Sequence, residues 1–485
     1  MGKVFVFGIG GTGARVLRSL IFLLGSGVKC NASAVVPILI DPDSSNGDMN
    51  RTLDLMNIYK NINQTLSKKE NGFFATPILS LSSLKSETNK SSAFQFHLEK
   101  IQNTKFRDYI SYHSLGEANK HLIDLLFSEA NLNMEMQVGF RGNPNVGSVV
   151  LNQFKNSEDF KIFANNFSKG DRIFIISSIF GGTGASGFPL LLKNIRNAEK
   201  ETPNHALLRE SKIGAITILP YFGLLQDEKS SILKESFHPK TKAALDYYEK
   251  YINQSLDSMY YIGDTSLKDY SNFEGQSLQK NDAHFVELVS ALGILNFLEK
   301  EDTELTRGSL FYEYGIKSDT DDVTFDDLGK HSREFLLNPL SSYLFFIKYM
   351  ELKLSHSISR KQTWTMEGKN TFDENFISSP FYKTYISNFN SYYISWLTEL
   401  SKNKRSFTPF QLNVNEKNLF SLIKGLHEKK GFLKRKNFDA FDTELNSYAR
   451  QIKNDLKRED KFIHLFENAI QKMLYVKYEI GISNG

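Results

Sequence analysis

The 485-residue chain has little cysteine and no hydrophobic run long enough to cross a membrane. Its single cysteine, Cys30, excludes an intramolecular disulfide and any zinc site built from several cysteines. No apolar stretch reaches the roughly 18 residues that a transmembrane helix needs. The sequence opens directly on an apolar run and a glycine turn, which leaves no room for a signal peptide. We therefore expect a cytoplasmic protein with no membrane span.

Strong net charge and internal repeats are also absent. The formal net charge of +4 is too small to indicate nucleic-acid binding by itself. Basic runs at residues 402–405 and 429–436 are interpreted as solvated faces, and partner binding is the alternative for the second run. Aromatic residues are abundant at 13% and spread through periodic segments, so we expect them to pack in cores rather than stack on bases. The length predicts two or three domains.

No P-loop sequence of the form GxxxxGK[ST] occurs, but two other glycine-rich turns are present. They are GIGGTG at residues 8–13 and GGTGASG at residues 181–187. Each turn follows an apolar run and precedes a segment with helical spacing, from Ala14 and from Phe188. Glycine lets backbone N–H groups approach phosphate oxygens, and a following helix adds partial positive charge. Together the turns predict a phosphate-binding cradle with two walls, although either could be a strand-to-helix turn without a ligand.

The first turn alone also fits a dinucleotide-binding fingerprint. In that interpretation, Asp41 follows the next apolar run and holds a ribose hydroxyl. A dinucleotide-dependent oxidoreductase or an adenylate-forming enzyme therefore stays open, with some support from Asp43 and from Asn50-Arg51. An ordinary dinucleotide fold, however, does not need a second Gly-Gly-Thr-Gly loop after a later strand.

Apolar runs that alternate with helical segments predict an α/β fold with a parallel sheet. The expected strands lie at residues 4–7, 35–40, 172–177, 212–220 and 258–262. Ligands of such sheets bind at the carboxyl ends of the strands. Both glycine turns and Asp41 fall at these ends, so the predicted fold and the predicted site agree.

Residues 180–187, FGGTGASG, resemble the GGGTG[ST]G signature of the tubulin and FtsZ superfamily of GTP-binding, filament-forming proteins. Phe180 replaces the first glycine, and Ala185 shifts the end of the motif. The turn at residues 8–13 is similar to the first nucleotide loop of that family. Asn281 and Asp282, at the start of a long apolar segment, match the position that recognises guanine. The resemblance covers about residues 1–300 and is closest to divergent bacterial tubulin-like proteins.

The resemblance implies a GTP-binding domain at residues 1–300 with a long central helix at about 279–299. Residues 55–135 are interpreted as a largely helical insertion, and residues 301–485 as a mainly α-helical C-terminal domain that departs from the family. GTP or GDP and Mg²⁺ are the implied cofactors, with Asp41, Asp43 or bridging waters beside the metal ion. The implied nucleotide-binding residues are Gly8, Gly10, Gly11, Thr12, Gly13, Asp41, Arg141, Gly142, Gly181, Gly182, Thr183, Gly184, Ala185, Ser186, Asn281 and Asp282.

Hydrolysis in the family needs carboxylates from the next subunit, in a loop after the central helix. The GxxNxDxxD pattern of that loop is missing here, but Glu301, Asp302 and Glu304 lie at about the expected place as candidate catalytic acids. The resemblance thus implies a self-assembling protein, as a filament or oligomer, with an assembly-dependent GTPase and a protein partner for the C-terminal domain. The alternative on the same fold is a nucleotide-binding regulator or sensor with weak or no hydrolysis, for example in a bacterial conflict system.

Overall fold

The computed structural model describes residues 2–67, 71–84, 94–140, 142–224, 237–264, 268–270, 280–308, 310–314, 320–429, 437–452 and 455–481. The chain forms two compact units. Unit 1 comprises Met1–Ser19, Asn31–Met56 and Ile78–Ser318, and unit 2 comprises Leu20–Cys30, Asn57–Pro77 and Asp319–Gly485. Two early segments, Leu20–Cys30 and Asn57–Pro77, thus belong to the same unit as the C-terminal residues. The single boundary predicted near residue 300 does not include this arrangement. No helix in the described ranges is long and apolar enough to cross a membrane.

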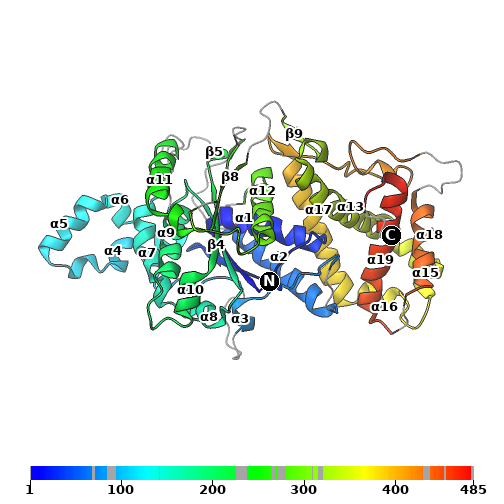
Figure 1. The fold of residues 1–485 in the computed structure, drawn as a ribbon, viewed down its shortest axis with the longest axis horizontal. Coiled ribbons are helices and arrows are strands. Elements are labelled where there is room, and N and C mark those ends of the chain that lie inside the picture. The colour runs from blue at the N-terminus through cyan, green and yellow to red at the C-terminus, as the bar shows by residue number, and fades with distance from the viewer. Residues whose placement is uncertain are drawn as a thin grey trace. The chain divides into compact units, whose positions relative to one another are not determined.

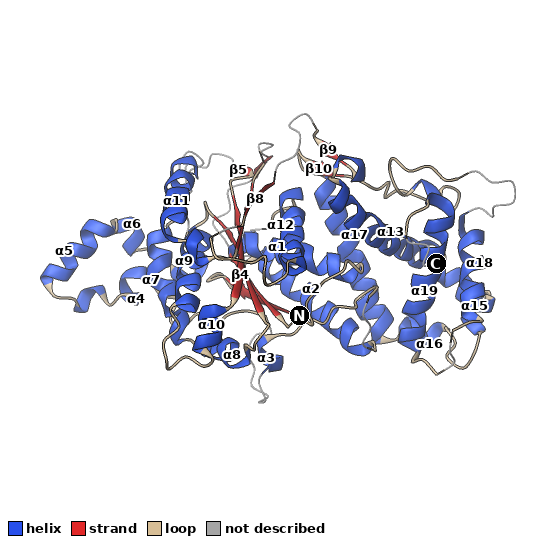
Figure 2. Ribbon diagram, viewed as in Figure 1, coloured by secondary structure: helices blue, strands red, loops and turns tan. Residues whose placement is uncertain are grey.

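A six-stranded parallel sheet forms the centre of unit 1 (Figure 2). Its strands, in spatial order, are β2 (Val35–Ile40), β1 (Val4–Ile9), β3 (Arg172–Ser178), β4 (Lys212–Ile218), β6 (Ser258–Ile262) and β8 (Phe311–Tyr314). Every neighbouring pair in this sheet is parallel. The first three strands along the chain are buried throughout, as expected for a parallel sheet covered on both faces. The predicted α/β fold with a parallel sheet is confirmed.

Helices cover both faces of this sheet. The helices that matter for the site are α1 (Gly10–Gly25), α7 (Pro144–Leu151), α9 (Gly182–Arg196) and α12 (Phe285–Glu299). Figure 1 shows α1 and α12 on one side of the sheet and α7 and α9 on the other.

The glycine turns are themselves the first turns of helices, which corrects the predicted helix starts at Ala14 and Phe188. Helix α1 begins at Gly10 and α9 at Gly182, directly after or soon after the preceding strand. Gly10 turns the chain with φ +73°, a conformation that side chains disfavour. A β-carbon added to Gly13 would lie 2.5 Å from the carbonyl carbon of Gly8, so strand and helix meet closely. The glycines thus lie in the first turn of each helix, where backbone N–H groups have no partner within the helix itself.

The central helix starts later than the predicted residue 279. It begins at Phe285 because His284 and Glu287 form a capping box, in which the His284 backbone N–H donates to Glu287 Oε2 at 2.9 Å. Asn281 and Asp282 therefore lie in the segment that leads into α12, and not on the helix itself.

The region between β2 and β3 is built mostly of helices. It holds α2 (Gly47–Thr65), α3 (Leu81–Leu84), α4 (Phe106–Tyr109), η1 (Tyr112–Ser114), α5 (Glu117–Leu126), α6 (Glu129–Leu132), η2 (Met136–Val138), α7, η3 (Asn152–Asn156) and α8 (Glu158–Asn166). Helices α4 to α6 form a projection at one end of unit 1, drawn in cyan in Figure 1. We call residues 106–132 the arm.

The C-terminal part of the chain is mainly helical, as predicted. Its long helices are α13 (Lys330–Leu352), α17 (Ser387–Ser401), α18 (Asn437–Ala449) and α19 (Arg458–Tyr478). Unit 2 has an aromatic core in which Trp396 stacks on Phe22 at 4.9 Å. The periodicity of residues 418–427 predicts a helix there, and this prediction is wrong. Only the short turn η8 (Leu419–Ser421) forms before Gly425 turns the chain with φ +78°.

Candidate functional site

Two glycine turns and a third loop meet at the carboxyl edge of the sheet. A β-carbon placed on Gly10 would lie 3.6 Å from Thr183 Cβ and 3.9 Å from the Gly184 nitrogen. One placed on Gly182 would lie 3.1 Å from the backbone nitrogens of Gly142 and Asn143. The starts of α1, α7 and α9 therefore come together.

We call this arrangement the cradle and define it as residues 10–12, 142–143 and 182–184. Helix N-termini present unpaired N–H groups and partial positive charge, so three of them in one place favour an anion. Because glycines line the cradle, backbone N–H groups can approach that anion closely.

Other predicted nucleotide-binding residues serve the packing of the cradle. A β-carbon on Gly8 would lie 2.6 Å from Leu17 Cδ1, so this glycine lets α1 approach β1. The Ser186 hydroxyl donates to the Gly182 carbonyl at 2.7 Å and is buried. Ala185 lies in the first turns of α9, and Gly181 is the N-cap residue of that helix. Arg141 lies outside the described residues.

Lys240 is a cation beside the cradle that sequence analysis missed. It lies on α11 (Phe237–Tyr251), and its ammonium group donates to the Gly142 carbonyl at 2.8 Å. Partial burial lowers the pKa of Lys240. No sequence pattern relates this lysine to the glycine turns, because only the tertiary fold brings α11 to the loop at residues 142–143.

Asp41 lies in the loop after β2, next to the first glycine turn. The loop is close to that turn because a β-carbon on Gly11 would lie 3.6 Å from the side-chain nitrogen of Asn46. The pKa of Asp41 is raised to about 7, mainly by burial. A hydrogen bond from the Asp43 backbone lowers this pKa, and the charges of Asp43 and Asp48 contribute to raising it. A carboxylate held this way favours a proton or a cation.

Side chains in the described part of the chain do not form a complete ligand set for the predicted Mg²⁺. Within the described ranges, no group of three or more His, Cys, Asp or Glu side chains is placed to hold a metal ion. Mg²⁺ bound mainly through phosphate oxygens and waters would need only one or two carboxylates, so the role of Asp41 beside the metal ion stays a prediction.

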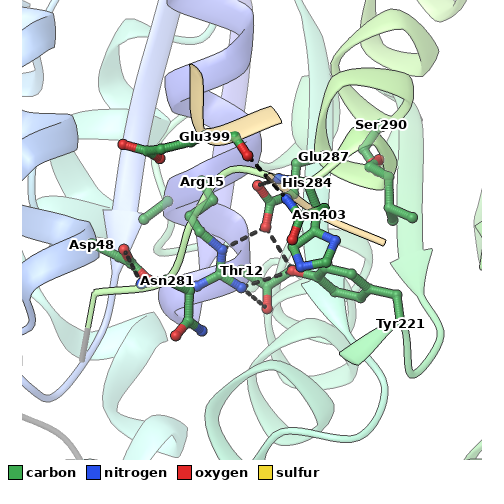
Figure 3. Close-up of polar contacts among 12 residues, drawn as sticks. Thr12, Arg15, Asp48, Tyr221, Asn281, His284, Glu287, Ser290, Glu399 and Asn403 are labelled. Atoms are coloured by element: carbon green, nitrogen blue, oxygen red, sulfur yellow. Dashed lines mark hydrogen bonds and ion pairs between the residues drawn. The ribbon is translucent and has the colours of Figure 1, made fainter. Parts of the chain in front are cut away.

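Arg15 is the centre of a buried polar network that joins the first glycine turn to three other elements (Figure 3). Its guanidinium donates to Glu287 at 2.5 Å and to Asp48 at 2.5 Å. It also donates to the Thr12 hydroxyl at 3.3 Å and to the Tyr221 hydroxyl at 2.7 Å. Burial alone would lower the pKa of Arg15, but Tyr221, Glu287 and Asp48 raise it above its ordinary value, so Arg15 stays charged.

The network also holds the segment predicted to recognise guanine. Asp48 Oδ1 accepts a hydrogen bond from the Asn281 backbone N–H at 3.2 Å and pairs with Arg51 at 2.7 Å. Arg51 in turn donates to the Asn281 carbonyl. The structure thus brings the segment at Asn281 and Asp282 together with the first glycine turn through Arg15 and Asp48.

The candidate catalytic acids are not brought to the cradle of their own chain. Glu301, Asp302 and Glu304 follow α12, whose 15 residues span roughly 22 Å. Asp302 pairs at 2.8 Å with Arg172, the first residue of β3, and so lies at the amino edge of the sheet, opposite the glycine turns. Glu304 accepts a hydrogen bond from the Glu301 backbone at 2.7 Å.

No protein-family model and no curated protein matches the chain. Among solved structures it is similar to a GTPγS-bound protofilament of CetZ2 from Haloferax volcanii, with 12% identity, a TM-score of 0.30, and 61% of this chain and 58% of that one covered. It is also similar to CetZ from Methanosaeta thermophila, with 17% identity, a TM-score of 0.29, and 62% and 56% covered.

A third similar structure is a protofilament of TubZ from Bacillus thuringiensis serovar israelensis, with 12% identity, a TM-score of 0.27, and 81% and 80% covered. The chain spans about three fifths of the length of the CetZ structures that it matches. TM-scores this low do not establish a shared fold, so any assignment depends on the residues of the site.

Proposed function

We propose that this chain is a guanine-nucleotide-binding, self-assembling protein of the tubulin and FtsZ type. The observation that carries the proposal is the cradle, in which Gly10 faces Thr183 and Gly184 across the carboxyl edge of a parallel sheet. A polyphosphate fits this place because its charge is met by three helix N-termini and by Lys240.

Guanine specificity would come from the segment before α12. A carboxylate at Asp282 can accept hydrogen bonds from both N1–H and the exocyclic amine of guanine, whereas adenine has no such pair of donors. The backbone of the neighbouring Asn281 is fixed by Asp48 and Arg51, which favours a defined base position.

Hydrolysis in this proposal needs two copies of the chain. The acids Glu301, Asp302 and Glu304 lie at the amino edge of the sheet, and the cradle lies at the carboxyl edge. Head-to-tail stacking would place the acids of one copy beside the nucleotide of the next, where a carboxylate could orient and polarise the attacking water.

Phosphate release from GTP, measured over a wide dilution series, tests this proposal. We expect specific activity to rise with protein concentration. A mixture of Gly182→Val with a Glu301/Asp302/Glu304 triple-alanine variant should regain activity that neither has alone. A Glu374→Ala/Glu416→Ala variant, which changes exposed acids of unit 2, is the matched control and should behave like the parent protein. Specific activity independent of concentration contradicts catalysis between copies.

A second candidate function is a nucleotide-dependent regulator with weak or no hydrolysis. The observation that favours it is the local engagement of the acids: Asp302 is paired with Arg172, and Glu304 bonds the Glu301 backbone. Guanine nucleotide that binds but is not turned over at any protein concentration would favour this function over a GTPase.

A further inference from the structure

A cleft of unit 1 lies along the second half of α9. Its lining comes from α9, from α8 with the turn η3, and from the loop at residues 198–203. The volume of the cleft is about 460 Å³, in the range of sites that bind small molecules. Lys193 in the lining lies roughly 17 Å along α9 from Gly182, so the cleft is separate from the cradle.

Five asparagine side chains line the cleft, and the fold does not use them. They are Asn152, Asn156, Asn165, Asn194 and Asn197. None of these side chains forms a hydrogen bond with a described residue, not even Asn194, whose amide nitrogen is shielded from solvent. The nearby Asn166, by contrast, donates from its side-chain amide to the Ile162 carbonyl at 2.9 Å. The four exposed amides of the lining are therefore available to a ligand.

Other contacts fix the loop that completes the cleft. The Asn204 side chain donates to the backbone carbonyls of Ala164 at 2.9 Å and Asn165 at 3.2 Å, which ties the loop to the end of α8. Lys155 on η3 pairs with Glu199 in the loop at 3.2 Å. The cleft is thus formed before a ligand binds, and little ordering has to accompany binding.

The charged groups of the lining leave a net positive charge. They are Lys155, Lys161 and Lys193, with Glu199 and Glu201 as the acids. Because Lys155 and Glu199 pair with each other, Lys161 and Lys193 are the cations that remain for a ligand. Neither of these two lysines forms an ion pair within the described ranges. Glu201 can accept hydrogen bonds from hydroxyl groups, but its charge disfavours a bare inorganic anion.

We propose that this cleft binds a small hydroxylated anion, namely a sugar phosphate or a sugar acid. An asparagine amide both donates and accepts hydrogen bonds, as a hydroxyl group does, so the amides suit the hydroxyls of a sugar. Lys161 and Lys193 bind the phosphate or carboxylate group. Leu190 and Pro203 offer apolar surface to the carbon skeleton. A nucleobase fits less well, because Phe160, the aromatic residue of the lining, is only 1% exposed and cannot stack on it. This binding goes beyond the proposed function and does not depend on it.

Four probes separate the groups that the cleft recognises. Ligand-detected NMR titrations use glucose 6-phosphate, gluconate, neutral glucose and inorganic phosphate. We expect a sugar anion to bind, and we expect glucose, which lacks the charge, and inorganic phosphate, which lacks the sugar hydroxyls, to bind at least about tenfold more weakly. The tighter of the two sugar anions identifies phosphate or carboxylate as the preferred group. No binding of either sugar anion at about 10 mM overturns the proposal. Inorganic phosphate that binds as tightly as glucose 6-phosphate, and so as an adventitious ion only, also overturns it.

Variants of the lining locate the bound anion. Lys161→Met/Lys193→Met should weaken binding of the tighter sugar anion at least about tenfold, and Asn165→Ala should weaken it to a smaller extent. Lys169→Met/Lys200→Met, which changes lysines outside the lining, is the matched control and should bind like the parent chain. All these positions are exposed, so the variants should remain folded. Unchanged affinity in Lys161→Met/Lys193→Met overturns the proposal.

The cradle variant Gly182→Val separates this site from the proposed function. It should lose GTP and keep the sugar anion, whereas Lys161→Met/Lys193→Met should keep GTP. If the parent chain binds no GTP but binds the sugar anion with the expected lysine dependence, the cleft stands and the proposed function fails. Loss of the sugar anion in folded Gly182→Val would place it in the cradle and overturn the proposal. Oligoglutamate that binds more tightly than either sugar anion, with the same lysine dependence, would overturn it in favour of an acidic protein segment.

Discussion

Replacing Arg15 by methionine should destabilise unit 1 strongly. The side chains of Asp48 and Glu287 are 0% exposed, and both lose a partner at 2.5 Å in this variant. Asp48 would keep Arg51, and Glu287 would keep the hydroxyl of Tyr221 at 2.6 Å. Glu287 is therefore the carboxylate left without any cation in the network.

The expected loss follows from the cost of an unpaired buried charge. Removing one partner of a buried ion pair costs about 3–5 kcal/mol. For a unit of this size that corresponds to a fall in Tm of roughly 5–8 °C. Thermal and urea unfolding followed by circular dichroism measure it. Arg107→Met is the matched control, because its partner Glu129 is largely exposed and such a pair is worth at most about 1 kcal/mol.

A double variant shows whether charge or packing is responsible. Arg15→Met/Glu287→Met removes the orphaned carboxylate together with its cation, and apolar replacement of a buried pair is often nearly neutral. It should recover much of the stability lost in Arg15→Met. If Arg15→Met is no less stable than the Arg107→Met control, or if the double variant is less stable still, this account of the network is refuted.

Three further predictions concern charge, ligand and core. Burial raises the pKa of Asp41 to about 7, so the stability that protonated Asp41 contributes is fully present below its unfolded pKa and is lost as pH rises through 7. Asp41→Asn should therefore become more stable than the parent protein between the two pKa values, by on the order of 4 kcal/mol. Parallel profiles of unfolding free energy against pH, measured in urea, would contradict this. Lys240→Met should weaken GTP binding about tenfold in a fluorescent-nucleotide titration, while Lys242→Met should not; equal effects would remove Lys240 from the site. Trp396→Ala should cost about 3–5 kcal/mol in urea unfolding because the indole is fully buried against Phe22, and a loss below about 1 kcal/mol would contradict that packing.

The central strands could be predicted because strands buried on both faces appear as continuous apolar runs. Strand β8 (Phe311–Tyr314) was missed because it lies at the edge of the sheet, where Phe311 is exposed, and its short sequence alternates with a glutamate. The glycine turns were recognised from sequence, but their helix starts were not, because apolar periodicity cannot show that a helix begins within a run of glycines.

The buried network could not be predicted from local sequence. Arg15 and Glu287 are 272 positions apart, and neither belongs to a recognisable motif. One signal was nevertheless present: each is a charged residue within a mainly apolar helix, and a charge in a buried helix requires a partner. Such a residue indicates that a network exists, whereas only the fold identifies its other members.

The most direct test of the central claim is the identity of the nucleotide that the purified protein carries. Heat-released nucleotide is separated by ion-exchange chromatography for the parent chain, for Gly10→Val and for Gly182→Val. The cradle and the segment at Asn281 and Asp282 predict GTP or GDP in the parent chain and none in either variant, with all three proteins folded. NAD or ATP in place of guanine nucleotide, or unchanged nucleotide in both glycine variants, would contradict the account.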